Sequence, residues 1–341
     1  MVRLPAGKFE ISQPLVIRSE DVLLIGAGTA THIHNTNTEG RPALLVRPDG
    51  YEQDKKKRLW RIKLTDFRIT GNEKSGDGVA AFGINEIFIQ GLTVSYHGGH
   101  GILLDHCYED PRVSDSLITY NKKSGLELLG CHDIVVAANQ FEENLDAVRC
   151  LDGFNLCMTG NCVDDHLRHG VVIENTYGSV VSGNMIEECQ GWAVVLDRDC
   201  YGITISANVI AHEFQGGIDL RDAHGCAISA NTFTIVRPHA LRIGPNSGRI
   251  TVTGNNFSDS FIGEGAEKRR SNDQAAGGIV VEGASDIAVS GNVFSGLSTP
   301  AVENGAAPGR RVVFANNVLT EVESQHDGLK ESVTTNNVPS K

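Results

Sequence analysis

Short apolar stretches alternate with polar turns along almost the whole chain. One set of stretches lies directly before an asparagine, as in residues 179–184 (SVVSGN) and 203–208 (ITISAN). A second set follows about ten residues later, as in 192–197 (WAVVLD) and 216–221 (GGIDLR). Both sets are rich in β-branched residues and are bounded by Gly, Asn or Asp, which is typical of strands between tight turns. Because no long helix fits between these turns, we predict an all-β protein.

The asparagines recur at a nearly constant step, which is the signature of a solenoid. The steps between them run from 22 to 24 residues, apart from one step of 37. A β-propeller would need a longer period, of about 40 residues. We therefore predict a parallel β-helix of about 11 coils with roughly 23 residues in each coil. The repeated asparagines are Asn139, Asn161, Asn184, Asn208, Asn231, Asn255, Asn292 and Asn316.

The repeat also sets the expected boundaries. We predict that the β-helix covers residues 1–330 and that a polar tail follows at 331–341. The one long step predicts an inserted loop at 261–278 (FIGEGAEKRRSNDQAAGG). Asparagine tolerates left-handed backbone geometry, so we expect each repeated Asn to turn the chain and to stack on the Asn of the next coil.

Strand alternation assigns the faces of the second set of stretches. The predicted inward positions are Ile102, Leu126, Val148, Val171, Val194, Ile218, Leu241, Ile279 and Val302, which are apolar throughout. The first outward column is Leu103, Glu127, Arg149, Val172, Val195, Asp219, Arg242 and Val280. The next outward column is Asp105, Leu129, Leu151, Glu174, Asp197, Arg221, Gly244 and Glu282.

Charged residues gather where these outward columns pass through residues 174–242. Because neighbouring coils lie about 4.8 Å apart, we expect Glu174, Asp197 and Arg221 to form one row and Asp219 and Arg242 another. Two carboxylates in one groove repel each other, which leaves a proton donor beside an ionised partner. That arrangement suits cleavage of a glycosidic bond, so we predict Asp197, Asp219 and Glu174 as catalytic residues.

Other side chains of the same face are predicted to bind substrate. Arg221 and Arg242 can hold an ionised carboxylate or orient sugar hydroxyls, and Arg149 occupies the same outward column as Arg242. Trp192 and His239 each begin a strand of this face, where an indole ring can stack on a sugar. A purely structural interpretation stays open, since outward Asp and Arg residues on a solvated sheet often only neutralise each other.

Composition narrows the choice of partner. The formal net charge of −12 argues against nucleic acid, whose phosphates need a basic face. No apolar run is long enough to cross a membrane, so no membrane partner is expected. No signal peptide is visible, which predicts a cytoplasmic protein unless the N-terminus is trimmed. The eight cysteines form no CxxC pair, and we expect free thiols and no metal site.

The opening residues 2–28 (VRLPAGKFEISQPLVIRSEDVLLIGAG) and the later 64–72 (LTDFRITGN) resemble right-handed parallel β-helix proteins of the pectate-lyase-like superfamily. Within it, the layout resembles the inulin fructotransferases, which form difructose anhydrides. The resemblance rests on Asp219 in GGIDLRD, Arg242 one coil later in HALRIG, and the long insert before GGIVVEG. It implies a right-handed coil and a homotrimer with active sites between subunits. Such proteins usually carry an amphipathic helix before the first strand, so we expect trimming or a covering partner here.

Three functions remain open at this stage. The first is an enzyme that cleaves or transfers glycosidic bonds of a poly- or oligosaccharide, of hydrolase or fructotransferase type, without a cofactor. The second is a uronate polysaccharide lyase in which Arg221, Arg242 or His239 serves as the base and Ca²⁺ neutralises the substrate carboxylate. The third is a non-catalytic glycan-binding or structural β-helix.

Overall fold

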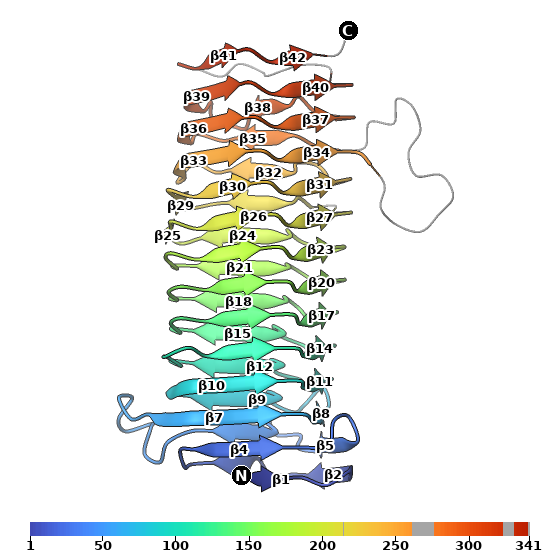
Figure 1. Cartoon of the computed structure of the whole chain (residues 1–341), viewed down its shortest axis with the longest axis vertical. Coiled ribbons are helices and arrows are strands. Elements are labelled where there is room, and N and C mark those ends of the chain that lie inside the picture. The colour runs from blue at the N-terminus through green and yellow to red at the C-terminus, as the bar shows by residue number, and fades with distance from the viewer. Residues whose placement is uncertain (214, 261–275, 323–330, 340–341) are drawn as a thin grey trace, which may run out of the picture. The chain divides into compact units, whose positions relative to one another are not determined.

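The computed structural model describes residues 1–213, 215–260, 276–322 and 331–339. The chain divides into unit 1 (residues 1–167) and unit 2 (residues 168–341), and each is described by itself. All regular elements among the described residues are strands, as the sequence predicts (Figure 1). The structure has about 13 coils, slightly more than the 11 or so predicted.

Among the described residues, the coils build three parallel sheets, which we name A, B and C in chain order, and each of the first twelve coils supplies a strand to all three. In unit 1, sheet A contains β1 (Val2–Arg3), β4 (Val22–Ile25), β7 (Leu59–Thr65), β10 (Ile84–Gln90), β13 (Arg112–Ser114), β16 (Val135–Ala137) and β19 (Cys157–Thr159). Sheet B contains β2 (Gly7–Ile11), β5 (Thr31–Asn35), β8 (Arg68–Thr70), β11 (Thr93–Ser95), β14 (Leu117–Thr119), β17 (Gln140–Glu142) and β20 (Cys162–Asp164). Sheet C contains β3 (Leu15–Ile17), β6 (Leu44–Val46), β9 (Val79–Phe82), β12 (Ile102–Asp105), β15 (Leu126–Leu129) and β18 (Val148–Leu151).

Unit 2 repeats this arrangement. Its sheet A contains β22 (Val180–Ser182), β26 (Thr204–Ser206), β30 (Ala227–Ser229), β33 (Gly248–Thr253), β36 (Ser285–Ser290), β39 (Arg310–Ala315) and β41 (Val333–Thr335), with the short β25 (Cys200–Tyr201) and β29 (Ala223–His224) beside them. Sheet B contains β23 (Met185–Glu187), β27 (Val209–Ala211), β31 (Thr232–Thr234), β34 (Asn256–Ser258), β37 (Val293–Ser295), β40 (Val318–Thr320) and β42 (Val338–Pro339). Sheet C contains β21 (Val171–Glu174), β24 (Val194–Asp197), β28 (Ile218–Leu220), β32 (Leu241–Ile243), β35 (Ile279–Val281) and β38 (Val302–Asn304).

The predicted register of sheet C matches the structure. In unit 1, Glu127 pairs with Leu103 on one side and with Arg149 on the other. In unit 2, Asp219 lies between Val195 and Arg242. The predicted inward positions, listed above, are buried in both units. Inward aliphatic residues alternate with outward residues along each strand. Their packing fixes the register of sheet C and therefore the positions of the outward side chains.

An asparagine ladder runs through each unit, with one correction to the predicted turn. In unit 2, each ladder Asn donates its backbone N–H and its Nδ2 to the Oδ1 of the next, at 2.8–3.1 Å. The left-handed residue is the one before the Asn, such as Ala207 or Gly254, because the Asn backbone serves the ladder. For the same reason Asn317 continues the ladder, whereas Asn316 takes the left-handed turn.

Other predictions concern the ends and the surface. The predicted insert falls mostly on residues 261–275, which lie outside the described residues. Within the predicted polar tail, β41 and β42 pair with β39 and β40, so the tail adds strands to the solenoid. None of the eight cysteines, all of which are described, forms a disulfide.

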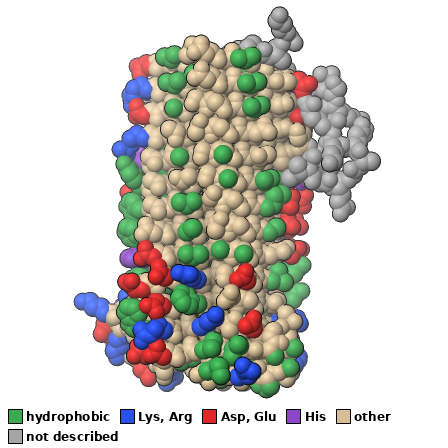
Figure 2. All heavy atoms as spheres, in the orientation of Figure 1, with side chains coloured by type: hydrophobic (Ala, Val, Ile, Leu, Met, Phe, Trp, Pro, Cys, Tyr) green, Lys and Arg blue, Asp and Glu red, His purple; other side chains and the backbone are tan. Residues whose placement is uncertain are grey.

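Charge is unevenly distributed over the face drawn in Figure 2. Acidic and basic side chains gather over the first coils of unit 1, where β4 and β7 lie in Figure 1. The Arg61–Asp21 ion pair, 2.5 Å long and largely exposed, belongs to these coils. Within the described part of the chain, no helix is present that could span a membrane.

Candidate functional site

Asp219 is the centre of an ion-pair cluster on the outer face of sheet C in unit 2. Its side chain is only 2% exposed, although it points outward from β28. The Arg221 Nε donates to its Oδ2 at 2.7 Å, and the Arg242 Nη1 donates to its Oδ1 at 3.1 Å. Two guanidiniums thus fold over one carboxylate, which explains why an outward residue is buried.

The same two arginines extend the cluster in both directions. Arg242 also donates to Glu282 Oε2, at 2.6 Å from Nη2 and 3.1 Å from Nε. Arg221 Nη1 lies 3.6 Å from Asp197 Oδ2, a longer contact. Asp197 and Glu282 are each about a quarter exposed, and both arginines about a third. The outer surface of the cluster therefore offers carboxylate oxygens and guanidinium N–H groups to solvent, above a buried Asp219.

Glu174 and Asp197 are direct neighbours at the edge of this cluster. They end β21 and β24 and pair in register, and both are half-buried. Neighbouring parallel strands lie about 4.8 Å apart, so two carboxyl groups stand side by side on adjacent coils. Asp197 also accepts the backbone N–H of Arg198 at 2.8 Å. The turn after Leu196 is one residue longer than the turn after Leu220, as the sequence indicated, with Arg198 and Asp199 left-handed.

His239 and Trp192 lie in the loops that precede β32 and β24, respectively. Nδ1 of His239 is 3.2 Å from Glu303 Oε1, outside hydrogen-bond geometry. Burial, together with the charge of Arg242, lowers the pKa of His239, so its ring is neutral at neutral pH. The Trp192 ring lies directly over Gly216, where no side chain would fit. Trp192 is half-buried, and packing accounts for part of its surface.

Arg149 lies in unit 1 and belongs to a second cluster. Its Nη1 donates to Glu127 Oε1 at 3.0 Å, and Ser124 Oγ donates to Glu127 Oε2 at 2.8 Å. His100 Nδ1 lies 3.7 Å from the same Oε2. The Glu127 side chain is 5% exposed, and this burial raises its pKa. Burial also lowers the pKa of His100 to about 4.

Glu127 is the residue that the sequence reasoning missed. It stood in the predicted outward column, directly before Arg149, but was given no role. The available signal was the step from an acid to an arginine one coil later, which Asp219 and Arg242 repeat. Among the described residues, the acidic groups of neither cluster form a triad close enough to hold a metal ion.

The structure thus brings the predicted residues of unit 2 together and places Arg149 with Glu127. Asp197, Asp219, Arg221 and Arg242 form one connected network, with Glu174 beside Asp197 and His239 beside Arg242. Their catalytic and binding roles stay predictions. Chemically, the network can present a carboxyl pair, fixed guanidinium donors and a neutral imidazole.

Comparisons with known proteins address the family and the fold. A family model described as a right-handed beta helix region matches residues 49–144, 77–233 and 192–338. No curated protein sequence matches the chain. Among solved structures, the chain is similar to the A-module of the Azotobacter vinelandii mannuronan C-5 epimerase AlgE6, with 17% identity, a TM-score of 0.61, and coverage of 100% of this chain and 90% of that chain.

Two further structures show how varied such proteins are. The DFA-IIIase from Arthrobacter chlorophenolicus is 15% identical, with a TM-score of 0.57 and coverage of 92% of this chain and 82% of that chain. The Streptococcus pneumoniae surface adhesin PfbA is 12% identical, with a TM-score of 0.60 and coverage of 92% and 84%. At these identities the likeness shows the fold alone, because one fold carries many functions. The family match spans most of the chain, and the chain belongs to the family of right-handed beta helix regions.

Proposed function

We propose that this protein cleaves or transfers glycosidic bonds of a poly- or oligosaccharide, with Glu174 and Asp197 as its carboxyl pair. The observation that carries the proposal is their in-register pairing at half-buried positions on the outer face of sheet C. Carboxyl groups about 5–5.5 Å apart are used in double-displacement glycoside cleavage. Side chains on adjacent parallel strands, about 4.8 Å apart, can adopt that separation.

The neighbouring arginine suggests which carboxyl does what. Arg221 lies beside Asp197, so we assign Asp197 the ionised role of nucleophile or stabiliser of positive charge at the anomeric carbon. Glu174 then gives its proton to the oxygen of the leaving sugar and takes a proton back from water or from an acceptor hydroxyl. Water as the acceptor gives hydrolysis, and a sugar hydroxyl gives transfer.

Asp219 takes a positioning role in this proposal instead of the catalytic role predicted from its sequence. Its carboxylate is covered by Arg221 and Arg242, so substrate reaches it only if those side chains move. By accepting hydrogen bonds from both, it fixes the guanidinium that faces Asp197. Arg242 and His239 remain proposed contacts for sugar hydroxyls.

Charge supports a neutral glycan as the substrate. The network holds three carboxylates, Asp197, Asp219 and Glu282, against two guanidiniums, in a chain whose net charge is −12. A polyanion would meet repulsion there. The similarity of fold to a DFA-IIIase makes fructan the first neutral glycan to test.

The experiment is an activity screen with paired variants. Purified protein is incubated with a fructan, a neutral glucan and a polyuronate, and products are separated by chromatography. New reducing ends mark hydrolysis, and cyclic or elongated products without them mark transfer. Asp197→Asn and Glu174→Gln should each lower kcat at least about 100-fold. Asp222→Asn, on the turn after β28, is the matched control and should keep full activity. Full activity in both site variants would refute the carboxyl pair.

A uronate lyase is the second candidate, and His239 is the observation that favours it. A neutral imidazole beside Arg242 suits removal of a proton next to a sugar carboxylate. This function predicts ultraviolet-absorbing unsaturated products from the polyuronate, their loss in His239→Gln, and sensitivity to a chelator if Ca²⁺ takes part. Glycan binding without any product would favour the non-catalytic alternative.

A further inference from the structure

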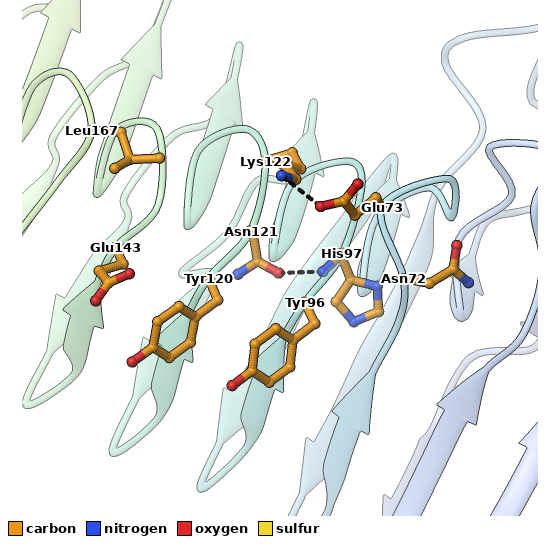
Figure 3. Close-up of a pocket in the computed structure, with 9 residues that line it drawn as sticks. All are labelled: Asn72, Glu73, Tyr96, His97, Tyr120, Asn121, Lys122, Glu143 and Leu167. Atoms are coloured by element: carbon orange, nitrogen blue, oxygen red, sulfur yellow. Dashed lines mark hydrogen bonds and ion pairs between the residues drawn. The ribbon is translucent and has the colours of Figure 1, made fainter.

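A cleft in unit 1, at the corner where the chain leaves sheet B, is lined by no residue of either ion-pair cluster (Figure 3). Its volume of about 390 Å³ falls within the range of roughly 300–1,000 Å³ typical of small-molecule sites. Its lining includes Tyr96, which follows β11, and Tyr120, which follows β14. The proposed glycosidase reaction uses none of its residues.

The two tyrosines form a stacked and solvent-exposed pair. Their ring centroids are 5.1 Å apart and the ring planes differ by 7°. Tyr96 is 52% exposed and Tyr120 is 37% exposed. Figure 3 shows both rings pointing outward from the coils in the same direction. In a chain with 6 Tyr and 2 Trp, two aromatic rings left in water beside a cleft call for an explanation.

The same corner is polar in the next coils of unit 1. The residue that follows β17 is Glu143 and the residue that follows β20 is Asp165, each left-handed like Tyr96 and Tyr120. This corner therefore accommodates a charged residue in two neighbouring coils. The fold does not require tyrosine at positions 96 and 120, since neither ring packs in the core.

Polar groups surround the rings. Lys122 Nζ lies 2.9 Å from Glu73 Oε1, and both side chains are more than half exposed. Glu143 lines the cleft on the other side of Tyr120 (Figure 3). These groups offer donors and acceptors at the rim of an apolar floor, which is the combination that a sugar ring with apolar C–H faces and hydroxyl edges requires.

We propose that the cleft formed by Tyr96 and Tyr120 binds a saccharide ring of a neutral glycan, with an aromatic face against the sugar C–H groups and the Lys122, Glu73 and Glu143 side chains on its hydroxyls. Neutral glycan is favoured over nucleic acid because the net charge of −12 repels phosphates. The proposal rests on the proposed function only for the choice of glycans to test, because the cleft contains neither Glu174 nor Asp197.

The test is direct binding by isothermal titration and by affinity gel electrophoresis, with the fructan, glucan and polyuronate used above. Tyr96→Ala and Tyr120→Ala should each weaken the Kd for one neutral glycan by about tenfold. Tyr120→Phe should bind as the native protein does, because stacking uses the ring and not the hydroxyl. Tyr201→Ala is the matched control: Tyr201 is 41% exposed in unit 2 and packs on Arg249. Thermal melting checks that each variant is folded.

The outcomes for the cleft and for the proposed enzyme can be told apart. Unchanged Kd in both alanine variants, or absence of binding to every glycan by the native protein, overturns the cleft. An equal loss in Tyr201→Ala also overturns it. Loss of turnover in Asp197→Asn with retained binding leaves the cleft intact, whereas tyrosine-dependent binding without any turnover supports the cleft and counts against the enzyme.

Discussion

Glu127 in unit 1 and Asp219 in unit 2 are both buried outward carboxyl groups, but they have different hydrogen-bond partners. Each occupies the first outward position of a sheet C strand, each is almost fully buried, and each has an arginine in register on the next strand. The strands differ two residues later, where unit 2 has Arg221 and unit 1 has Leu129. Asp219 therefore holds two guanidiniums, whereas Glu127 holds one, together with a serine hydroxyl.

The difference teaches that the partners of a buried outward carboxyl group, and not its burial alone, decide what it can do. At Glu127, desolvation outweighs one arginine and raises the pKa. At Asp219, the carboxylate is the common anchor of two side chains whose outer atoms reach solvent. The first arrangement raises the pKa of its carboxyl group, and the second fixes the direction of two guanidinium groups.

The largest expected effect follows removal of the charge at Asp219. Asp219→Asn leaves Arg221 and Arg242 without their shared anion, and we expect a loss of about 3–5 kcal/mol in the free energy of unfolding. Denaturant unfolding measures it, with Asp222→Asn as a control that changes little. A loss below about 1 kcal/mol would mean that water satisfies both arginines, which would remove the contrast with Glu127.

The next effect is a pH dependence that belongs to the Glu127 cluster. In the unfolded chain His100 binds a proton near pH 6.5, whereas in the folded chain its pKa is about 4. Stability from His100 is therefore present above pH 6.5 and is lost as the pH falls towards 4. Between pH 7 and pH 4, we expect the free energy of unfolding of His100→Asn to fall by about 2–3 kcal/mol less than that of the native protein.

Comparison of two variants isolates this effect. The buried His97 and His166 of unit 1, whose pKa values are also lowered to about 4, are present in both proteins and cancel in the difference. The charged groups around His100 are likewise unchanged; they are Lys123, Arg149, Asp146 and Glu127. Parallel stability curves for the native protein and His100→Asn would contradict the assignment.

Glu127→Gln should have a small effect of the opposite sign to Asp219→Asn. Because the folded state raises the Glu127 pKa, its contribution is favourable at low pH and is lost as the pH rises above about 4.5. A neutral glutamine avoids that loss, so we expect a gain of up to about 1 kcal/mol at pH 7 and none at pH 4. Denaturant unfolding at both pH values decides it, and a loss as large as that of Asp219→Asn would refute the comparison.

The smallest expected effect concerns position 129, where unit 1 has Leu129 and the equivalent residue of unit 2 is Arg221. Leu129→Arg supplies unit 1 with the second guanidinium that Arg221 supplies in unit 2. We expect the Glu127 pKa to fall, because a second nearby cation favours the ionised carboxylate, with stability within about 0.5 kcal/mol of the native value. NMR titration of the Glu127 carboxyl carbon measures the pKa, with Leu129→Gln as the control. An unchanged pKa would show that the second arginine is not what separates the clusters.

The periodicity of the sequence predicted the fold because every coil needs aliphatic residues at its inward positions and turn residues between its strands. Inward aliphatic residues fixed the register of sheet C, and with it the pairing of Asp219 with Arg242 and of Glu174 with Asp197. The Asn repeat predicted the ladder but not its turn, since a small residue before the Asn, as at Gly254, takes the left-handed backbone.

The alternation of apolar and polar positions could not predict that Asp219 is buried. Alternation places Asp219 on the outer face, but its burial depends on how two long arginine side chains fold back over it. The tyrosine cleft was missed for a related reason. Tyr96 and Tyr120 lie in turns, where no strand alternation applies, and only the three-dimensional stacking of coils brings their rings together.

The asparagine ladder also has a consequence for how such a protein can evolve. Asn255 and Asn292 are 37 residues apart, yet their ladder bonds, 2.9 and 3.0 Å long, match those across the ordinary steps. The ladder therefore has one Asn per coil, whatever the number of residues in that coil, and a loop can be inserted between two ladder asparagines without breaking their hydrogen bonds. Duplication or loss of a whole coil would leave every remaining column aligned, so the outer surface can be rewritten one coil at a time while the scaffold keeps its hydrogen bonds.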